Sequence, residues 1–332
     1  MKAILMHAPG APEVLRLADV PPPSIANEAG VLVRLRAAGV NPIDTKLRAR
    51  GTYFPDRVPA ILGCDGAGVV EAVGAGVRRF RVGDEIYFCN GGIGGDPGNY
   101  AEYAVVDERF AAPKPASIDF THAAAAPLVL ITAWEALHDR ARMAAGQTVL
   151  IHAGAGGVGH VAIQLAKAAG CRILTTVSSA AKADFARGLG ADEVILYRET
   201  SFVEAVLDLT RGTGADIVFD TVGGEVFQAS FGAVRPYGDL VTLLQPETET
   251  DWKPARLRNL RISQELMLSP MVFGWDEARQ HQAWILGECA ALFDSGRLRI
   301  HVHGVLPLNE AAEAHRRIEA GGMTGKLVLT IG

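Results

Sequence analysis

The fold of this chain is indicated by the stretch His152-Ala153-Gly154-Ala155-Gly156-Gly157-Val158-Gly159, in which three glycines match the pattern Gly-x-Gly-x-x-Gly. A glycine pattern alone is a weak signal, but here it follows a short apolar run typical of a buried strand and opens a run typical of a helix. In that setting Gly154 permits a tight turn, Gly156 lets the backbone approach a pyrophosphate, and Gly159 lets helix and strand pack closely. The first N–H groups of the helix and the positive end of its dipole then bind phosphate. We therefore predict that a dinucleotide binds at Gly154, Gly156, Gly157, Val158 and Gly159, and that these are not a mere glycine-rich core turn.

Strand-like and helix-like runs alternate on the C-terminal side of this loop, beginning with the strand Thr148–His152 that leads into it. Strict alternation predicts a doubly wound parallel sheet of the Rossmann type, with helices on both faces and right-handed crossovers. The expected later strands are Ile173–Val177, Glu193–Leu196, Ile217–Asp220 and Leu240–Leu244, and the expected helices are Gly159–Ala169, Ala180–Leu189, Phe202–Leu209 and Glu225–Val234.

The first third of the chain has a different character, because short β-rich runs are separated there by proline and glycine clusters. This pattern predicts a small, mostly antiparallel barrel or sandwich. The last sixty residues mix helix and strand, and we expect them to rejoin this part. The predicted domains are therefore residues 1–124 with 272–332, and residues 125–271. The expected early strands are Lys2–Met6, Val14–Leu17, Val31–Ala37, Gly68–Val73, Asp84–Phe88 and Ala101–Val106.

Composition excludes several classes of protein. The chain has 332 residues, is 49% hydrophobic and carries a net charge of −5. It shows no basic stripe for nucleic acid and no uncharged apolar run long enough to span a membrane. The N-terminal residues lack a full signal-peptide layout, so we expect a cytoplasmic protein. The cysteines Cys64, Cys89, Cys171 and Cys289 are scattered, which predicts neither a disulfide framework nor a four-cysteine zinc site.

The nicotinamide cofactor is predicted from the end of the second strand after the loop. An NAD enzyme usually has an acidic residue there, which binds the ribose hydroxyls. This chain instead has Ser178, Ser179 and Lys182, and the first acid, Asp184, lies inside the next helix. Hydroxyls and a cation suit a 2′-phosphate, so we predict NADPH. Helix capping is the alternative role of the serines, and Ser179 can do both.

At these residues the chain resembles the zinc-free quinone oxidoreductase branch, often called zeta-crystallin-like, of the medium-chain dehydrogenase/reductase superfamily. The resemblance covers nearly the whole chain. It implies a GroES-like catalytic domain, a Rossmann domain and commonly a homodimer. Its motifs are Ala38–Asp44, Gly63–Val70, Val82–Asp84, Ala153–Gly159 and Gly325–Leu329.

The resemblance also implies roles for single residues. Lys182 and Tyr197 match positions that bind the 2′-phosphate, and Thr132 and Val222 match positions beside the nicotinamide. Leu243 and Leu244 match positions that line the cofactor, and Asn41 and Tyr53 match positions at the substrate end. Ordinary strand packing is the alternative role for Tyr197, Val222, Leu243 and Leu244.

Zinc separates this branch from the alcohol dehydrogenases. Those enzymes have a cysteine where this chain has Asn41, and a Gly-His-Glu run where it has Gly63-Cys64-Asp65. The third ligand cysteine has no counterpart in Ala123–Thr132. Zinc needs Cys, His or Asp/Glu ligands in a tetrahedral array. We therefore expect no metal, and we expect Cys64 to be a small buried residue. The loop Cys89–Gly98, which replaces the structural zinc lobe, is expected either to flex at the mouth of the site or to be a plain solvated loop.

These observations predict an NADPH-dependent oxidoreductase that transfers a hydride to a quinone or another conjugated carbonyl compound. Without zinc, hydrogen-bond donors must stabilise the developing oxyanion, and Tyr53 and Asn41 are the candidates. The alternative role of Tyr53 is an aromatic that covers the rim. One alternative function is reduction of enones or 2-enoyl thioesters, with Arg256–Arg261 as a basic channel. Another is a non-catalytic NADPH-binding sensor or structural protein. The strand-like run Ile262–Leu268 at a sheet edge predicts a homodimer.

Overall fold

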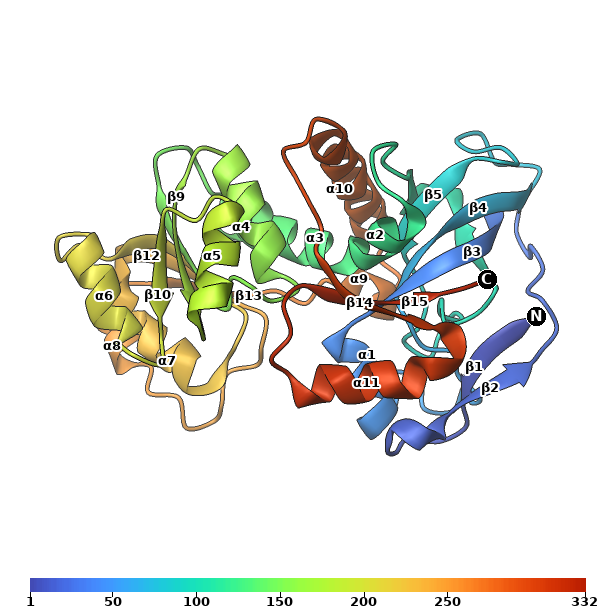
Figure 1. Cartoon of the computed structure of the whole chain (residues 1–332), viewed down its shortest axis with the longest axis horizontal. Coiled ribbons are helices and arrows are strands. Elements are labelled where there is room, and N and C mark those ends of the chain that lie inside the picture. Colours follow the sequence, from blue (N-terminus) through green and yellow to red (C-terminus); the bar gives the residue numbers. More distant parts are fainter. The chain divides into compact units, whose positions relative to one another are not determined.

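The computed structural model describes all 332 residues, and they form two compact units. Unit 1 contains Met1–Ile131, Leu268–Gly296 and Ile300–Gly332, and unit 2 contains Thr132–Met267 with Arg297–Arg299. Most of the helices and strands of both units are labelled in Figure 1. None of the helices is long and apolar enough to cross a membrane.

Unit 2 is built on a parallel sheet with the strand order β10-β9-β8-β11-β12-β13. The order reverses between β8 and β11, and ligands of such sheets bind at the carboxyl ends of the strands near this switch point. The strands are β8 (Thr148–Ile151), β9 (Arg172–Val177), β10 (Glu193–Leu196), β11 (Ala215–Asp220), β12 (Val234–Thr242) and β13 (Arg261–Gln264). The helices are α4 (Gly159–Ala168), α5 (Ala180–Gly188), α6 (Phe202–Leu209), α7 (Gly224–Ala233) and α8 (Lys253–Leu257), preceded by a π-helical turn at Glu135–Arg140.

The expected strands and helices of unit 2 are confirmed, but several ends are shifted, and β13, for example, ends at Gln264 and not at Leu268. The largest shift is at the start of β12. Strand β12 begins at Val234, well before the predicted start at Leu240. The prediction placed the start too late because Pro236 and Gly238 lie in this part of the strand and neither residue favours a strand. The structure accommodates them with a register shift between β11 and β12 and with a positive φ of 60° at Tyr237. The core of the unit is a continuous apolar cluster that includes Leu150, Leu174, Val218, Phe227, Phe231 and Leu240.

Unit 1 contains a seven-stranded sheet with the order β14-β15-β3-β4-β5-β7, in which β6 also pairs with β3. All its pairs are antiparallel except β14 with β15, which are parallel and come from the C-terminal part of the chain. A separate two-stranded sheet joins β1 to β2. The strands are β1 (Lys2–Met6), β2 (Leu15–Asp19), β3 (Gly30–Val40), β4 (Asp65–Val73), β5 (Glu85–Cys89), β6 (Tyr103–Asp107), β7 (Ala111–Pro113), β14 (Val302–Pro307) and β15 (Lys326–Thr330).

Two helices of unit 1, over Pro42–Arg50 and Ser269–Phe273, are missing from the sequence-based prediction. Pro42 suggests a turn, but it stands at the first position of α1 (Pro42–Arg50), where its absent N–H is not needed. Asn41 caps this helix in a reciprocal capping box with Asp44. The other helices are α2 (Phe120–Ala125), α3 (Pro127–Trp134), α9 (Ser269–Phe273), α10 (Asp276–Asp294) and α11 (Ala311–Ala320), with short 3-10 turns at Pro12–Val14, Glu108–Phe110 and Leu308–Glu310.

Candidate active site

The glycine-rich loop joins β8 to α4 and leaves no space for side chains at two positions. A Cβ atom on Gly154 would lie 2.0 Å from Thr175 Oγ1, and one on Gly159 would lie 2.3 Å from the carbonyl oxygen of Ala153. The tight turn itself is made by Ala153, whose φ is +51°, so the expected conformational role of Gly154 falls to its neighbour. Gly154 is required because the backbone packs closely against β9, not because of its φ.

The start of α4 suits an anion. The helix begins at Gly159, and its cap residue, Val158, makes no side-chain capping bond. The first N–H groups of a helix need partners, and a phosphate can supply them. Gly156, Gly157 and Val158 are partly exposed, whereas the flanking residues are buried. The loop therefore fits the pyrophosphate of a dinucleotide.

The predicted 2′-phosphate residues gather at the ends of β9 and β10. Ser179 is the N-cap of α5, but its side chain makes no capping bond, so the capping alternative is not realised. Lys182 lies in the first turn of the same helix, and this first turn contains no acidic residue. Tyr197 follows β10, is 48% exposed, and donates its backbone N–H to the carbonyl of Val177 at 3.2 Å. Tyr197 is thus next to the strand end that leads to Ser178.

The loops after β11 and β12, which carry the predicted nicotinamide residues, are held by hydrogen bonds to one buried aspartate. This residue was not among the predicted site residues. Asp220, fully buried at the end of β11, accepts hydrogen bonds from the N–H groups of Val222 (2.9 Å) and Gly223 (3.0 Å). Its carboxylate also accepts a bond from Thr242 Oγ1 at 2.8 Å, and its carbonyl accepts one from Leu243 N–H at 3.1 Å. These bonds fix the loops after β11 and β12, so that Val222 stays 45% exposed. Leu244 follows in the second loop, and Thr132 is buried in α3.

The histidines that flank the glycine loop are structural. His152 contacts Thr176 Oγ1 at 3.1 Å and Ser230 Oγ at 3.0 Å, and burial lowers its pKa to about 4. His160 Nδ1 contacts the carbonyl of Gly156 at 2.9 Å. Both histidines therefore make local contacts within unit 2.

In unit 1, Asn41 belongs to a buried polar network. Its carboxamide nitrogen donates to Asp65 Oδ2 at 2.8 Å, and its oxygen accepts a hydrogen bond from the ammonium group of Lys326. Lys326 Nζ lies 3.8 Å from Asp65 Oδ2. All three residues are at most 3% exposed. Asn41 therefore lies behind the surface, and its carboxamide is already committed to Asp65 and Lys326.

A second set of buried polar groups lies beside this network. Asp44 accepts bonds from the backbone N–H of Asn41 at 2.9 Å and from the Tyr100 hydroxyl at 3.0 Å. Burial raises the pKa of Asp44 to about 7, although both bonds oppose the shift. Tyr100 also contacts His315 Nε2 at 3.3 Å. The Cys64 thiol lies 3.9 Å from Asp44 Oδ1 and is fully buried, which matches its expected role.

Tyr53 is placed differently from Asn41. Its side chain is 40% exposed, and its backbone N–H donates to the carbonyl of Ile93 at 3.1 Å. Tyr53 is therefore the accessible member of the predicted pair of donors.

The loop Cys89–Gly98 is not the plain solvated loop that was one of its two expected forms. Only Asp96 and Pro97 are exposed, and most of the loop is buried. The carboxamide of Asn99 donates to the carbonyls of Cys64 (2.9 Å) and Asn90 (3.0 Å), which anchors the base of the loop. The glycines of this loop permit close packing. A Cβ on Gly92, for example, would lie 2.6 Å from the carbonyl of Gly63.

The side chains near Asn41 do not fit a zinc ion. No group of three His, Cys, Asp or Glu side chains is arranged to hold a metal. Asp65 already accepts a bond from the N–H of Leu128 at 2.8 Å besides its contacts with Asn41 and Lys326. An ammonium ion beside these ligands would also repel a second cation. All four cysteines are buried and unpaired, and burial contributes to a raised pKa for each thiol.

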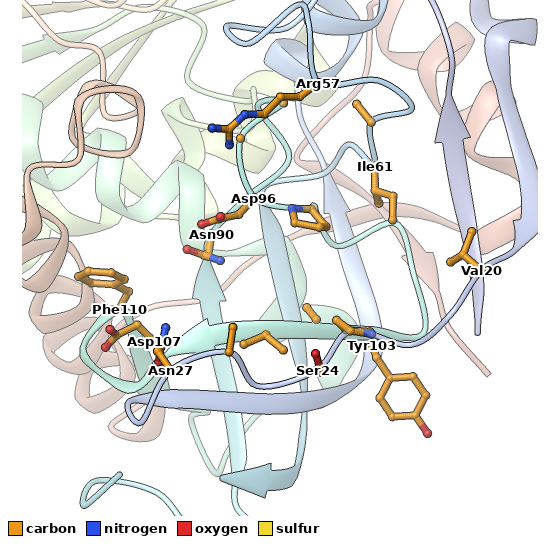
Figure 2. Close-up of a pocket in the computed structure, with 18 of the residues that line it drawn as sticks. Val20, Ser24, Asn27, Arg57, Ile61, Asn90, Asp96, Tyr103, Asp107 and Phe110 are labelled. Carbon is orange, nitrogen blue, oxygen red and sulfur yellow. The ribbon is translucent and has the colours of Figure 1, made fainter. Parts of the chain in front are cut away.

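Unit 1 also contains a cavity of about 910 Å³ that includes neither Asn41 nor Tyr53. Figure 2 shows its wall, in which Arg57 extends toward Asp96. Arg109 in this wall pairs with Asp107 at 2.9 Å and with Asp276 at 3.1 Å. The wall of this cavity thus contains both acidic and basic side chains.

Two family models match the chain. One, described as an alcohol dehydrogenase GroES-like domain, matches residues 27–116, and the other, described as a zinc-binding dehydrogenase, matches residues 189–329. The quinone oxidoreductase of Pseudomonas aeruginosa is 36% identical over 332 residues, which is 99% of each chain.

Solved structures agree over the full length. An alcohol dehydrogenase superfamily protein from Novosphingobium aromaticivorans has 36% identity and a TM-score of 0.92, with 100% of each chain covered. The quinone oxidoreductase of Escherichia coli, whose structure is a complex with NADPH, has 29% identity and a TM-score of 0.87, again with 100% of each chain covered.

Proposed function

Because the chain belongs to the quinone oxidoreductase branch of the medium-chain dehydrogenase/reductase superfamily, we propose that it reduces quinones or related conjugated carbonyl compounds with NADPH and without zinc. Membership establishes an oxidoreductase that uses a nicotinamide cofactor. The observation that carries the zinc-free part of the proposal is the Lys326 ammonium group, which is hydrogen-bonded to Asn41 and paired with Asp65. We assign dinucleotide binding to unit 2 and the substrate-end residues to unit 1.

The preference for NADPH is supported by the groups around the end of β9. Ser178, Lys182 and Tyr197 offer hydroxyls and a cation, and no carboxylate lies in the first turn of α5 to repel a 2′-phosphate. The E. coli relative is described as a complex with NADPH, which agrees with this assignment.

When bound, the nicotinamide cofactor would supply the hydride, while the protein would orient the reactants and stabilise charge. The glycine loop at the start of α4 would hold the pyrophosphate. Val222 and Leu243, which are fixed through Asp220, would line the nicotinamide end together with Leu244. Tyr53 would donate a hydrogen bond to the oxygen on which negative charge develops. Asn41 supports the substrate end from behind, since its carboxamide is buried.

Reduction of an enone uses the same geometry and stays as the alternative activity. A 2-enoyl thioester with a carrier phosphate is less well supported. Of the arginines that would form its channel, Arg261 is paired with Asp239 at 2.5 Å, and Arg258 donates to the carbonyl of Val234 at 3.0 Å.

One assay tests the proposal. Oxidation of NADPH is followed with 9,10-phenanthrenequinone, with an enone and with a crotonyl thioester, and each is repeated with NADH. We expect the quinone to be reduced fastest with NADPH. If only the thioester is reduced, the proposed substrate class changes from quinones to 2-enoyl thioesters. Tight NADPH binding with no turnover of any acceptor would favour the non-catalytic alternative.

A further inference from the structure

Lys326 is an unusual residue for its position. It is the first residue of β15, a strand whose next three residues are apolar and buried, and it is itself only 3% exposed. Burial of an ammonium group is costly unless hydrogen bonds and opposite charge compensate for it. Burial also lowers the pKa of Lys326, and Asp65 opposes that shift.

The ammonium group connects three segments that are distant in the sequence. It donates to the carbonyl of Val40 at 3.1 Å and to Asn41 Oδ1, and it lies 3.8 Å from Asp65 Oδ2. The other titratable groups that face it are Asp44 in α1, Cys64 before β4 and Cys89 at the end of β5. Lys326 thus joins β15 to the end of β3 and to the start of β4.

These contacts lead to the first residues of two helices. Asn41 is the N-cap of α1, and it exchanges hydrogen bonds with Asp44 in the capping box. Tyr53 follows shortly after the end of this helix at Arg50. Asp65 meanwhile accepts the N–H of Leu128 in the first turn of α3, the helix that carries Thr132. The Lys326 ammonium group is therefore linked to the first residues of both α1 and α3, and each of these helices leads to a candidate site residue.

We propose that Lys326 is a positioning residue of this reductase: acting through Asn41 and Asp65, its ammonium group fixes the starts of α1 and α3, and with them Tyr53 and Thr132. The proposal rests on the proposed function for its effect on turnover. The lysine supplies a fixed internal cation, which donates to the carbonyl of Val40 and the carboxamide of Asn41 and forms an ion pair with the carboxylate of Asp65. Small displacements of site residues can cost as much as about 100-fold in rate.

The test compares Lys326→Ala with a matched control, Lys114→Ala. Lys114 is another buried lysine of unit 1, whose side chain is 5% exposed, and it donates to two carbonyls and pairs with Glu85 at 3.1 Å. It contacts none of the site residues. We expect Lys326→Ala to lower kcat by roughly 10- to 100-fold with little change in the Kd for NADPH. Lys114→Ala should change only stability.

Three further measurements separate charge from packing. Lys326→Arg should restore part of kcat, and added methylammonium should rescue Lys326→Ala but not Lys326→Met. Hydrogen exchange of the amides of Asp44 and Leu128 should accelerate in Lys326→Ala, and this readout needs no substrate. Wild-type kcat and unchanged exchange in a folded Lys326 variant would overturn the proposal.

Two complications have defined outcomes. If Lys326→Ala does not fold, the double variant Lys326→Met/Asp65→Asn removes both charges, and wild-type kcat in that variant would overturn the proposal. If the wild type reduces no acceptor, the proposed function fails. The exchange measurement then still decides whether Lys326 holds the two helices.

Discussion

The ammonium group of Lys326 is hydrogen-bonded to the carboxamide of Asn41, although the two residues are 285 positions apart in the chain. The carboxamide and the neighbouring carboxylate of Asp65 are polarised by this internal cation. The same two residues therefore cannot serve a metal without displacing Lys326.

The first prediction concerns metal content. We expect the purified protein to contain no stoichiometric zinc and chelators to leave its activity unchanged, because the potential ligands near Asn41 are engaged with Lys326 and with each other. Elemental analysis of the protein before and after dialysis against a chelator checks this. One tightly bound zinc per chain would contradict it.

The second prediction concerns cofactor choice. Lys182→Ala should weaken NADPH binding by about 1.5 kcal/mol or less, the low end for a charge-assisted bond, because Lys182 is partly exposed. NADH binding should not change. Fluorescence titration gives both Kd values, with Lys167→Ala as control, since that lysine pairs with Asp192. Equal losses for both cofactors would remove Lys182 from the 2′-phosphate site.

Ser178→Asp offers the reverse experiment at the same strand end. A carboxylate there repels a 2′-phosphate and can accept bonds from ribose hydroxyls. We expect the ratio of kcat/KM for NADPH over NADH to fall. A ratio that stays constant would mean that Ser178 does not face the ribose.

The third prediction concerns Tyr53→Phe. Enone reduction leaves an enolate that must be held and protonated, whereas quinone reduction is driven by aromatisation. Loss of one donor should therefore slow enones more than quinones, and by less than the roughly 100- to 1000-fold cost of removing a buried oxyanion donor. Values of kcat/KM for both substrates give the answer. Equal decreases would make Tyr53 a positioning residue, and no decrease would make it a rim aromatic.

The fourth prediction concerns pH. The pKa of His152 is about 4 in the folded chain, below the ordinary value of 6.5. As the pH falls, the imidazole is therefore protonated in the unfolded chain before it is protonated in the folded chain. The free energy of unfolding should therefore fall between pH 6.5 and 4, by on the order of 3 kcal/mol from this group. Asp44, whose pKa is raised, acts in the opposite direction.

The contribution of His152 is isolated by His152→Gln, which removes the titration but keeps a side chain able to bond Thr176 and Ser230. Urea unfolding at several pH values should show a weaker acid dependence for the variant. Parallel curves for the two proteins would refute the assignment, because Asp44 and His315 titrate in both.

The fifth prediction concerns assembly. Strand β13 is the last strand of the parallel sheet and pairs only with β12, so its outer edge is unpaired within the chain. Two such edges can pair about a two-fold axis. We expect a homodimer in sedimentation experiments at micromolar concentration, and a monomer would count against it.

Local patterns predicted most of unit 2, because alternating strands and helices and the glycine loop are encoded in short segments. Helix α1 was missed although its signal is local, with Pro42 at its first position and Asn41 and Asp44 in a capping box three positions apart. The other failure concerns a residue that acts over a distance. Lys326 was noted only within a motif. Its one local signal is a lysine at the head of an apolar strand, and its partners lie in other segments.

The placement of the cysteines has a consequence for how such a protein survives its own chemistry. Quinones are electrophiles that add to thiolates, and an enzyme that handles them risks covalent self-inactivation. Here all four thiols are buried, and the pKa of Cys289, for example, is raised by burial to about 12. A buried thiol with a raised pKa is a poor nucleophile. The folded chain thus keeps its thiols protonated and out of reach of the compounds that it is proposed to reduce.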